Sequence, residues 1–201
     1  WSKVLELCRL YGMELDFVSR QEYALIKHTN ALEGEVLTIA EGGAHSLGLE
    51  GCTDIIKELP VDDFDKVVVS CGTGTTYAGM YNELKQTNQE HKLVGIQVLK
   101  GENYIAHELQ QKFKIRHAHI LDNYHLGGYA KTNDELLKLI SDFTKQTGVL
   151  LDPIYTGKAL YAFRDLIQKG IWSKQKIVLI HTGGLTGWFG KWDDLFKPST
   201  H

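Results

Sequence analysis

Short runs of β-branched and aliphatic residues recur along this chain of 201 residues and alternate with segments of helical periodicity. The clearest runs cover residues 66–70, 93–99 and 176–181, and each is far too short to span a membrane. Nearly continuous apolar runs of this length are typical of strands buried on both faces of a parallel sheet. The alternation therefore predicts an α/β protein with three layers, in which helices cover both faces of mostly parallel sheets.

The same periodicity predicts the other elements of the fold. Further strands are expected over residues 14–18, 36–40 and 117–121. Helices are expected over residues 2–11, 20–27, 46–59, 76–85, 105–112, 133–147 and 157–169. The acidic segment 59–65 marks a boundary, so residues 1–60 are expected to form the remainder of a smaller α/β subdomain and residues 61–201 a larger α/β domain.

The composition limits the partners and the compartment. With 22 Lys and Arg against 25 Asp and Glu, the net charge is −3, and neither a nucleic acid nor an anionic membrane is an expected partner. The three cysteines do not make a disulfide framework, which favours the cytoplasm. No metal site is expected, because the pair His117 and His119 lacks a third ligand. Since the chain begins at Trp1 within a helical pattern, we expect a fragment of a longer polypeptide.

A loop rich in glycine and threonine follows the run at 66–70. Its residues are Cys71, Gly72, Thr73, Gly74, Thr75 and Thr76. A helix is expected to begin there, so backbone N–H groups, the helix dipole and the hydroxyls could bind a phosphate. The loop lacks the Gly-Lys-Ser/Thr end of a P-loop and the G-x-G-x-x-G spacing of a dinucleotide site. The alternative is a tight turn without a ligand.

Two further motifs lie where other elements are expected to begin. Residues 41–48 contain adjacent glycines, including Gly43, which indicate either a backbone close to a ligand or a simple turn. Residues 152–158 (DPIYTGK) bring Tyr155 to a helix N-terminus. A tyrosine in that position could take part in proton transfer or could simply pack as an aromatic ring.

The last motif, His181 to Gly184 (HTGG), follows the final strand. Ligands of open α/β sheets bind beyond the carboxyl ends of strands, so Thr182 could donate a hydrogen bond to one, although a simple turn is the alternative. In this order the four motifs resemble those of the pyridoxal-phosphate enzymes related to D-cysteine desulfhydrase and 1-aminocyclopropane-1-carboxylate deaminase, in the tryptophan-synthase-β-like group of fold type II. The resemblance runs over nearly the whole chain.

The resemblance implies a partial fold type II structure, pyridoxal 5′-phosphate as cofactor, and residues 61–201 as the cofactor-binding domain. The chain would be the C-terminal two-thirds of such an enzyme, with the Schiff-base lysine upstream of residue 1. The residues that would bind the cofactor are Cys71, Gly72, Thr73, Gly74, Thr75, Thr76, Gly43 and, at the pyridine nitrogen, Thr182. Tyr129 and Tyr155 would be the two active-site tyrosines. The family also implies a homodimer.

The implied reaction is α,β-elimination on a small amino acid such as D-cysteine, which yields a 2-oxo acid and ammonia. A neutral hydroxyl at Thr182 would leave the pyridine unprotonated, which favours elimination. The alternative within the family is a 1-aminocyclopropane-1-carboxylate deaminase, although Thr156 stands where those enzymes carry a glutamate. The alternative of another class is a non-catalytic phosphate-ligand-binding or regulatory module that lacks the Schiff-base lysine.

Overall fold

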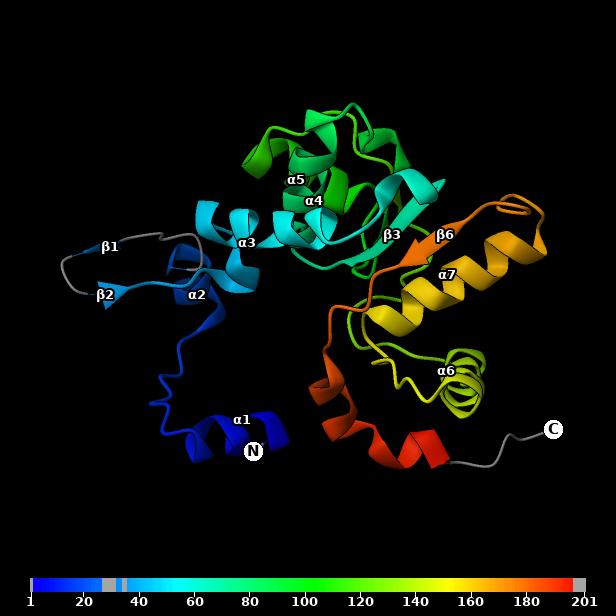
Figure 1. Cartoon of the computed structure of the whole chain (residues 1–201). Coiled ribbons are helices and arrows are strands. Elements are labelled where there is room, and N and C mark those ends of the chain that lie inside the picture. Colours follow the sequence, from blue (N-terminus) through cyan, green and yellow to red (C-terminus); the bar gives the residue numbers. More distant parts are fainter. Residues whose placement is uncertain (1, 27–31, 34–35, 197–201) are drawn as a thin grey trace.

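The computed structural model describes residues 2–26, 32–33 and 36–196 (Figure 1). These ranges contain the helices α1 (Lys3–Leu10), α2 (Arg20–Ile26), α3 (Ser46–Lys57), α4 (Thr75–Gln86), α5 (Tyr104–Phe113), α6 (Asp134–Thr147) and α7 (Thr156–Gln168). They also contain the strands β1 (Leu32–Glu33), β2 (Val36–Leu37), β3 (Lys66–Cys71), β4 (Leu93–Gln97), β5 (Ile120–Leu121) and β6 (Ile177–Leu179). Every predicted helix is found with small shifts at its ends, and the predicted end of α2 at residue 27 lies outside the described residues.

Four of the strands form one parallel sheet in the order β5-β4-β3-β6. The strand β3 lies inside this sheet, since its Val68 pairs with Val94 of β4 on one side and with Leu179 of β6 on the other. The three valines at 67–69 are fully buried. The β-branched run therefore forms the central buried strand that its composition predicts.

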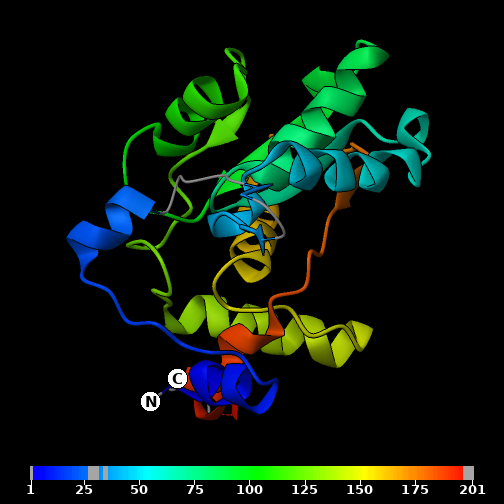
Figure 2. The same ribbon diagram turned by 90° about the vertical axis from the view of Figure 1, so that its left-hand side faces the viewer.

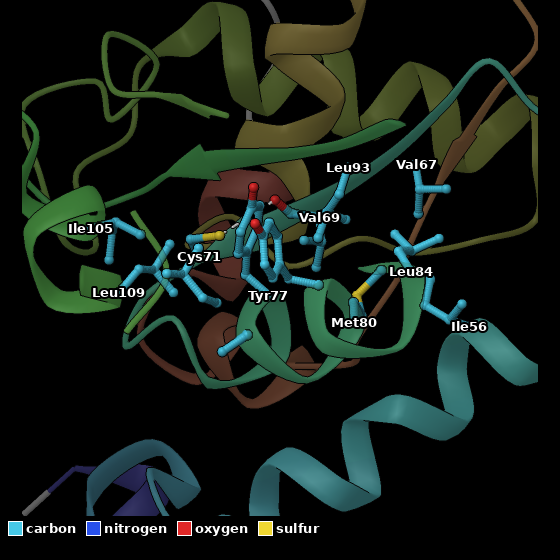
Figure 3. Packing of buried hydrophobic residues seen from close by; sticks show 13 residues of the cluster. Ile56, Val67, Val69, Cys71, Tyr77, Met80, Leu84, Leu93, Ile105 and Leu109 are labelled. Atoms are coloured by element: carbon cyan, nitrogen blue, oxygen red, sulfur yellow. Dashed lines mark hydrogen bonds between the residues drawn. The ribbon is translucent and has the colours of Figure 1, made fainter. Parts of the chain in front are cut away.

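Helices cover both faces of the sheet, as predicted. Successive side chains of a strand point to opposite faces. On one face of β3, Val67 and Val69 pack with residues of α3, α4 and α5, and Figure 3 shows Val69 among them. On the other face, Val68 packs with Ala159 and Ala162 of α7. The helix α6 then packs against α7 through a third apolar cluster.

The predicted strand over residues 14–18 is wrong. This segment has no regular secondary structure, and most of its side chains are exposed. A strand needs a neighbour to pair its backbone groups, and no described strand pairs with residues 14–18. The predicted strand over 36–40 is reduced to β2, which pairs antiparallel with β1. The strands β5 and β6 are likewise shorter than the predicted 117–121 and 176–181.

Elements from the two ends of the described chain lie side by side. Figure 2 shows α1 beside the 3₁₀ helix η4 (Leu185–Gly190), and the two elements are in contact. The start of α1 is capped by Ser2, whose Oγ accepts a hydrogen bond from the N–H of Leu5 at 3.3 Å. None of the helices in the described part of the chain is long and apolar enough to cross a membrane.

Candidate active site

A cleft of about 1200 Å³ lies beyond the carboxyl end of β3. One side is formed by Gly72 and Thr73, which follow β3 directly, and by Tyr155, which precedes α7. Residues 40, 41 and 44–46, which lead into α3, form another side, and Tyr129 lines the cleft as well. The cleft therefore lies where parallel α/β sheets bind their ligands, and it joins three of the motifs found in the sequence.

The glycine and threonine loop turns the chain from β3 into α4. Gly74 is the N-cap of α4 and has a φ of 86°, in the left-handed region that glycine tolerates. The hydroxyl oxygens of Thr73 and Thr75 lie 3.3 Å apart, within hydrogen-bonding distance. The first N–H groups of a helix have no partner inside the helix, so the start of α4 offers donors to an anion.

Two glycines allow other parts of the cleft to lie against this loop. A Cβ atom added at Gly72 would lie 2.8 Å from Cε1 of Tyr155, so the tyrosine ring rests directly on the loop backbone. A Cβ atom added at Gly42 would lie 2.8 Å from Cβ of Thr73, and Gly42 has a φ of 65°. The absence of both side chains brings the turn at residues 41–43 and the ring of Tyr155 up to the loop.

The two tyrosines predicted for the active site are neighbours. The rings of Tyr129 and Tyr155 meet edge to face, with their centroids 6.1 Å apart. Tyr129 is 56% exposed, whereas Tyr155 is half-buried. Burial raises the pKa of Tyr155 above its ordinary value of 10, and Tyr129 together with the carboxylates of Asp152 and Glu41 raises it further. Tyr155 is therefore a protonated hydrogen-bond donor at neutral pH.

Asp152 fixes the backbone around Tyr155. Its carboxylate is fully buried and accepts hydrogen bonds from the N–H groups of Ile154, Tyr155 and Thr156 at 2.8, 2.7 and 2.9 Å. It also accepts one from the hydroxyl of Thr156 at 2.6 Å. A carboxylate at a helix N-terminus satisfies N–H groups that would otherwise lack partners and interacts favourably with the helix dipole. The DPIYT sequence thus holds Tyr155 at the start of α7.

Several residues predicted for the site lie outside the lining of the cleft. The side chain of Cys71 points into the core beside Tyr77 (Figure 3), and burial raises its pKa to about 12. Gly43 contributes only backbone in the turn between the lining residues Glu41 and Ala44. The others are Gly74 and Thr75, which are buried, Thr76, half-buried on the first turn of α4, and Thr182, exposed in the loop after β6.

The sequence did not predict a role at the site for two charged residues. Glu41 lines the cleft, and its charge acts on Tyr155 and Tyr104. Lys158 lies on α7 with no exposed surface, and its Nζ donates hydrogen bonds to backbone carbonyl oxygens. The lysine belongs to the recognised DPIYTGK motif, but a lysine at a helix start is usually solvated, so nothing in the local pattern signals its burial.

Residues 2–183 match the sequence profile of a family described as "Pyridoxal-phosphate dependent enzyme". The chain belongs to this family. It is 32% identical over 214 residues to the mitochondrial bifunctional D-cysteine desulfhydrase/1-aminocyclopropane-1-carboxylate deaminase of Arabidopsis thaliana, covering 93% of this chain and 53% of the relative. It is 32% identical over 213 residues to a putative 1-aminocyclopropane-1-carboxylate deaminase of Pyrococcus horikoshii, covering 95% and 65%.

A solved structure of a 1-aminocyclopropane-1-carboxylate deaminase homologue superposes on this fold with a TM-score of 0.72 and 30% sequence identity. The superposition covers 94% of this chain and 64% of the chain of the solved structure. The predicted family and its three-layer α/β fold are thus confirmed. The chain spans about half to two-thirds of the length of the relatives and the structure that it matches.

The cleft fits the cofactor of this family, pyridoxal phosphate. Gly72 leaves the loop backbone without a side chain on the cleft side, and Thr73 lines the cleft with a hydroxyl. The start of α4, directly after this loop, adds N–H groups that have no partner inside the helix and the positive end of a helix dipole. These donors suit the phosphate group, and the aromatic rings of Tyr129 and Tyr155 suit a planar ring beside it.

Proposed function

We propose that the full-length protein catalyses a pyridoxal-phosphate-dependent α,β-elimination on a small amino acid such as D-cysteine. The C–S bond of the substrate breaks, and water hydrolyses the released 2-aminoacrylate, so the products are pyruvate, ammonia and sulfide. The observation that carries this proposal is the juxtaposition of Tyr129 and Tyr155 with the Gly72–Thr73 backbone in one cleft. The relative from Arabidopsis thaliana, whose name includes D-cysteine desulfhydrase, supports it.

The loop after β3 would hold the cofactor. Gly72, Thr73, Thr75 and the first turn of α4 would bind its phosphate through backbone N–H groups and hydroxyls. Thr182 would hydrogen-bond the pyridine nitrogen, and Gly43 would belong to the opposite side of the site. When bound, pyridoxal phosphate supplies the electron sink for loss of the α-proton and the leaving group.

Tyr155 would orient the substrate rather than act as a strong acid. A phenol whose pKa lies above 10 is a weaker acid than a thiol, whose ordinary pKa is about 8.5, so it does not readily protonate a departing thiolate. It keeps its proton and can donate a hydrogen bond to the departing sulfur. Tyr129, more exposed and in contact with its ring, would close the same side of the substrate site.

A 1-aminocyclopropane-1-carboxylate deaminase is the second candidate, and the name of the relative from Pyrococcus horikoshii favours it. Thr156 favours elimination instead. It occupies the position of the deaminase glutamate, and its hydroxyl is buried and donates to Asp152 at 2.6 Å. No carboxylate from this position would therefore reach the pyridine nitrogen, and a weaker electron sink suits elimination better than ring opening.

Product analysis of the full-length protein with pyridoxal phosphate tests this proposal. Pyruvate and sulfide from D-cysteine are expected, whereas 2-oxobutanoate from the cyclopropane substrate would establish the second candidate. Cofactor binding without either product would establish the non-catalytic phosphate-binding module. In a Tyr155→Phe variant we expect kcat to fall about 10- to 100-fold with little change in cofactor affinity. Equal losses in both quantities would contradict the substrate-orienting role.

We also propose a homodimer in the cytoplasm, with residues 1–60 completing a smaller subdomain and residues 61–201 forming the cofactor-binding domain. The family resemblance supports the dimer, and the free cysteines Cys8, Cys52 and Cys71 suit a reducing compartment. The start of β3 just after the boundary, at Lys66, supports the division. Light scattering and cell fractionation test the first two points, and limited proteolysis near residue 60 tests the third.

A further inference from the structure

Lys158 is a buried cation whose hydrogen bonds all go to backbone carbonyl oxygens. Its side chain has no exposed surface. Its Nζ donates to the carbonyl oxygens of Gly128 at 2.7 Å and His125 at 2.8 Å, and Val98 offers a third at 3.5 Å. An ammonium group has three donors, so these three acceptors can satisfy all of them. Burying a lysine is costly, and such complete pairing is what makes it tolerable.

The carbonyl groups belong to the two segments that adjoin α7 at the cleft. Val98 follows β4 directly, while His125 and Gly128 lie in the loop that leads to Tyr129. Lys158 itself lies in the first turn of α7, three residues after Tyr155, which is the N-cap residue of that helix. One ammonium group therefore connects the helix that carries one active-site tyrosine to the loop that carries the other.

The loop around Tyr129 needs such a restraint. Leu126 and Ala130 have φ angles of 54°, and Gly127 and Gly128 have φ angles of 95° and 120°. Left-handed conformations are unfavourable for Leu and Ala and persist only where surrounding contacts enforce them. A Cβ atom added at Gly128 would lie 3.2 Å from Cβ of Lys100, so the loop also packs closely on the segment after β4.

We propose that Lys158 is a positioning residue that holds Tyr129 beside Tyr155 by fixing the carbonyl groups of the loop at residues 125–128. It does not touch the substrate; it acts through Tyr129. The importance of this role for turnover rests on the proposed function. The restraint of the loop itself does not, and it can be measured without any substrate.

The charge state of Lys158 gives the restraint a pH dependence. The charged groups that act on its ammonium are the buried Asp152, which favours the charged form, and Lys191, which opposes it. Burial is the largest effect, and the pKa of Lys158 is lowered to about 8. Opening of the loop would return the amine to water and to an ordinary pKa near 10.5, so between about 8 and 10.5 opening requires uptake of a proton and becomes less favourable as the pH rises.

Amide hydrogen exchange in the full-length protein tests the restraint directly. In Lys158→Met we expect exchange to speed up at least about tenfold over residues 125–131 and to stay unchanged in β3 and β4. The matched control is Lys169→Met, which removes an exposed lysine at the end of the same helix. Unchanged exchange over residues 125–131 in Lys158→Met would overturn the proposal.

Two further measurements keep the proposal testable. In the unsubstituted protein, exchange over residues 125–131, corrected for its intrinsic pH dependence, should slow as the pH rises above about 8; a flat profile would overturn the proposal even if Lys158→Met fails to fold. Where turnover is measurable, Lys158→Met should lower kcat about 10-fold or more. In a double variant that also carries Tyr129→Phe, kcat should be little lower than in Tyr129→Phe alone. Losses that multiply in the double variant would contradict action through Tyr129.

Discussion

The two sides of the cleft are built differently. The side that carries Gly72, Thr73 and Tyr155 continues from the central strand β3 and from α7, and the buried side chains of Asp152 and Lys158 hold it in place. On the other side the residues 41–46 are exposed or half-buried, none of them fully buried, and Ile56 is the buried residue of the helix α3 that follows.

Local stability follows the amount of buried contact, so the two sides are expected to differ in rigidity. The anchored side can hold the cofactor phosphate and Tyr155 in fixed positions, which catalysis requires. The exposed side can adjust at low cost to the shape of a substrate. Under the proposed function, the fixed groups on one side of the cleft would serve the chemistry and the adjustable groups on the other side would serve selectivity.

The largest expected effect comes from breaking the anchor of the fixed side. In Asp152→Ala the N–H groups of Ile154, Tyr155 and Thr156 lose their buried acceptor. We expect a loss of about 3–5 kcal/mol in the free energy of unfolding, measured by denaturant titration. The control is Asp54→Ala, which removes an exposed pair with Lys57 and should cost less than about 1 kcal/mol. Similar costs for the two variants would contradict the anchor.

Gly72→Ala tests the contact between the loop and Tyr155. The new Cβ would lie 2.8 Å from the tyrosine ring, so the ring must move. We expect about 1–3 kcal/mol of destabilisation and a fall in kcat. Gly51→Ala, in open space on α3, should instead raise stability by about 0.5–1 kcal/mol. Unchanged kcat in Gly72→Ala would mean that the position of Tyr155 is unimportant.

The pH dependence of stability tests the burial of Lys158. Its pKa is lowered to about 8 in the folded protein from 10.5, so between these values the unfolded chain binds more protons. Stability contributed by this group therefore rises with pH between about 8 and 10.5. Relative to Lys158→Met, the unsubstituted protein should gain about 2 kcal/mol from pH 7.5 to 9.5. A difference between the two proteins that does not change with pH would mean that the lysine is not desolvated.

The smallest effect is expected at the exposed side. The Nδ1 atom of His45 accepts a hydrogen bond from the N–H of Leu47 at 3.3 Å and caps α3. His45→Ala should cost about 0.5 kcal/mol and alter KM more than kcat, because the residue lines the cleft. Asn133→Ala, which removes the shorter 2.9 Å cap of α6, should cost about 1 kcal/mol. A larger cost at His45 would reverse the proposed order of rigidity.

The parts of the site that follow from local sequence were predictable. The β-branched run at 67–69 determines β3, and the glycines after it determine where the chain turns into α4. The orientation of Cys71 also follows from the sequence, because alternation along β3 places its side chain on the same face as those of Val67 and Val69, toward the core. The prediction that Cys71 binds the cofactor as part of the loop did not take this alternation into account.

Other features depend on partners distant in the sequence. Residues 14–18 have the composition of a strand but no described strand beside them, so local pattern alone was misleading there. The burial of Lys158 depends on carbonyl groups 30 and 33 residues earlier in the chain, at Gly128 and His125. No window of local sequence contains both the cation and its acceptors.

The order of strands in the sheet has a consequence for how the protein is made. β3 pairs with β6, so Lys66 lies beside Ile177 although the two residues are far apart in the sequence. During synthesis β3 and β4 can pair early, but one edge of β3 stays open until the residues of β6 emerge. Such distant pairing slows folding, and an open apolar edge invites association with other chains. We therefore expect nascent chains that end before residue 177 to need a chaperone, although they already contain the whole glycine and threonine loop.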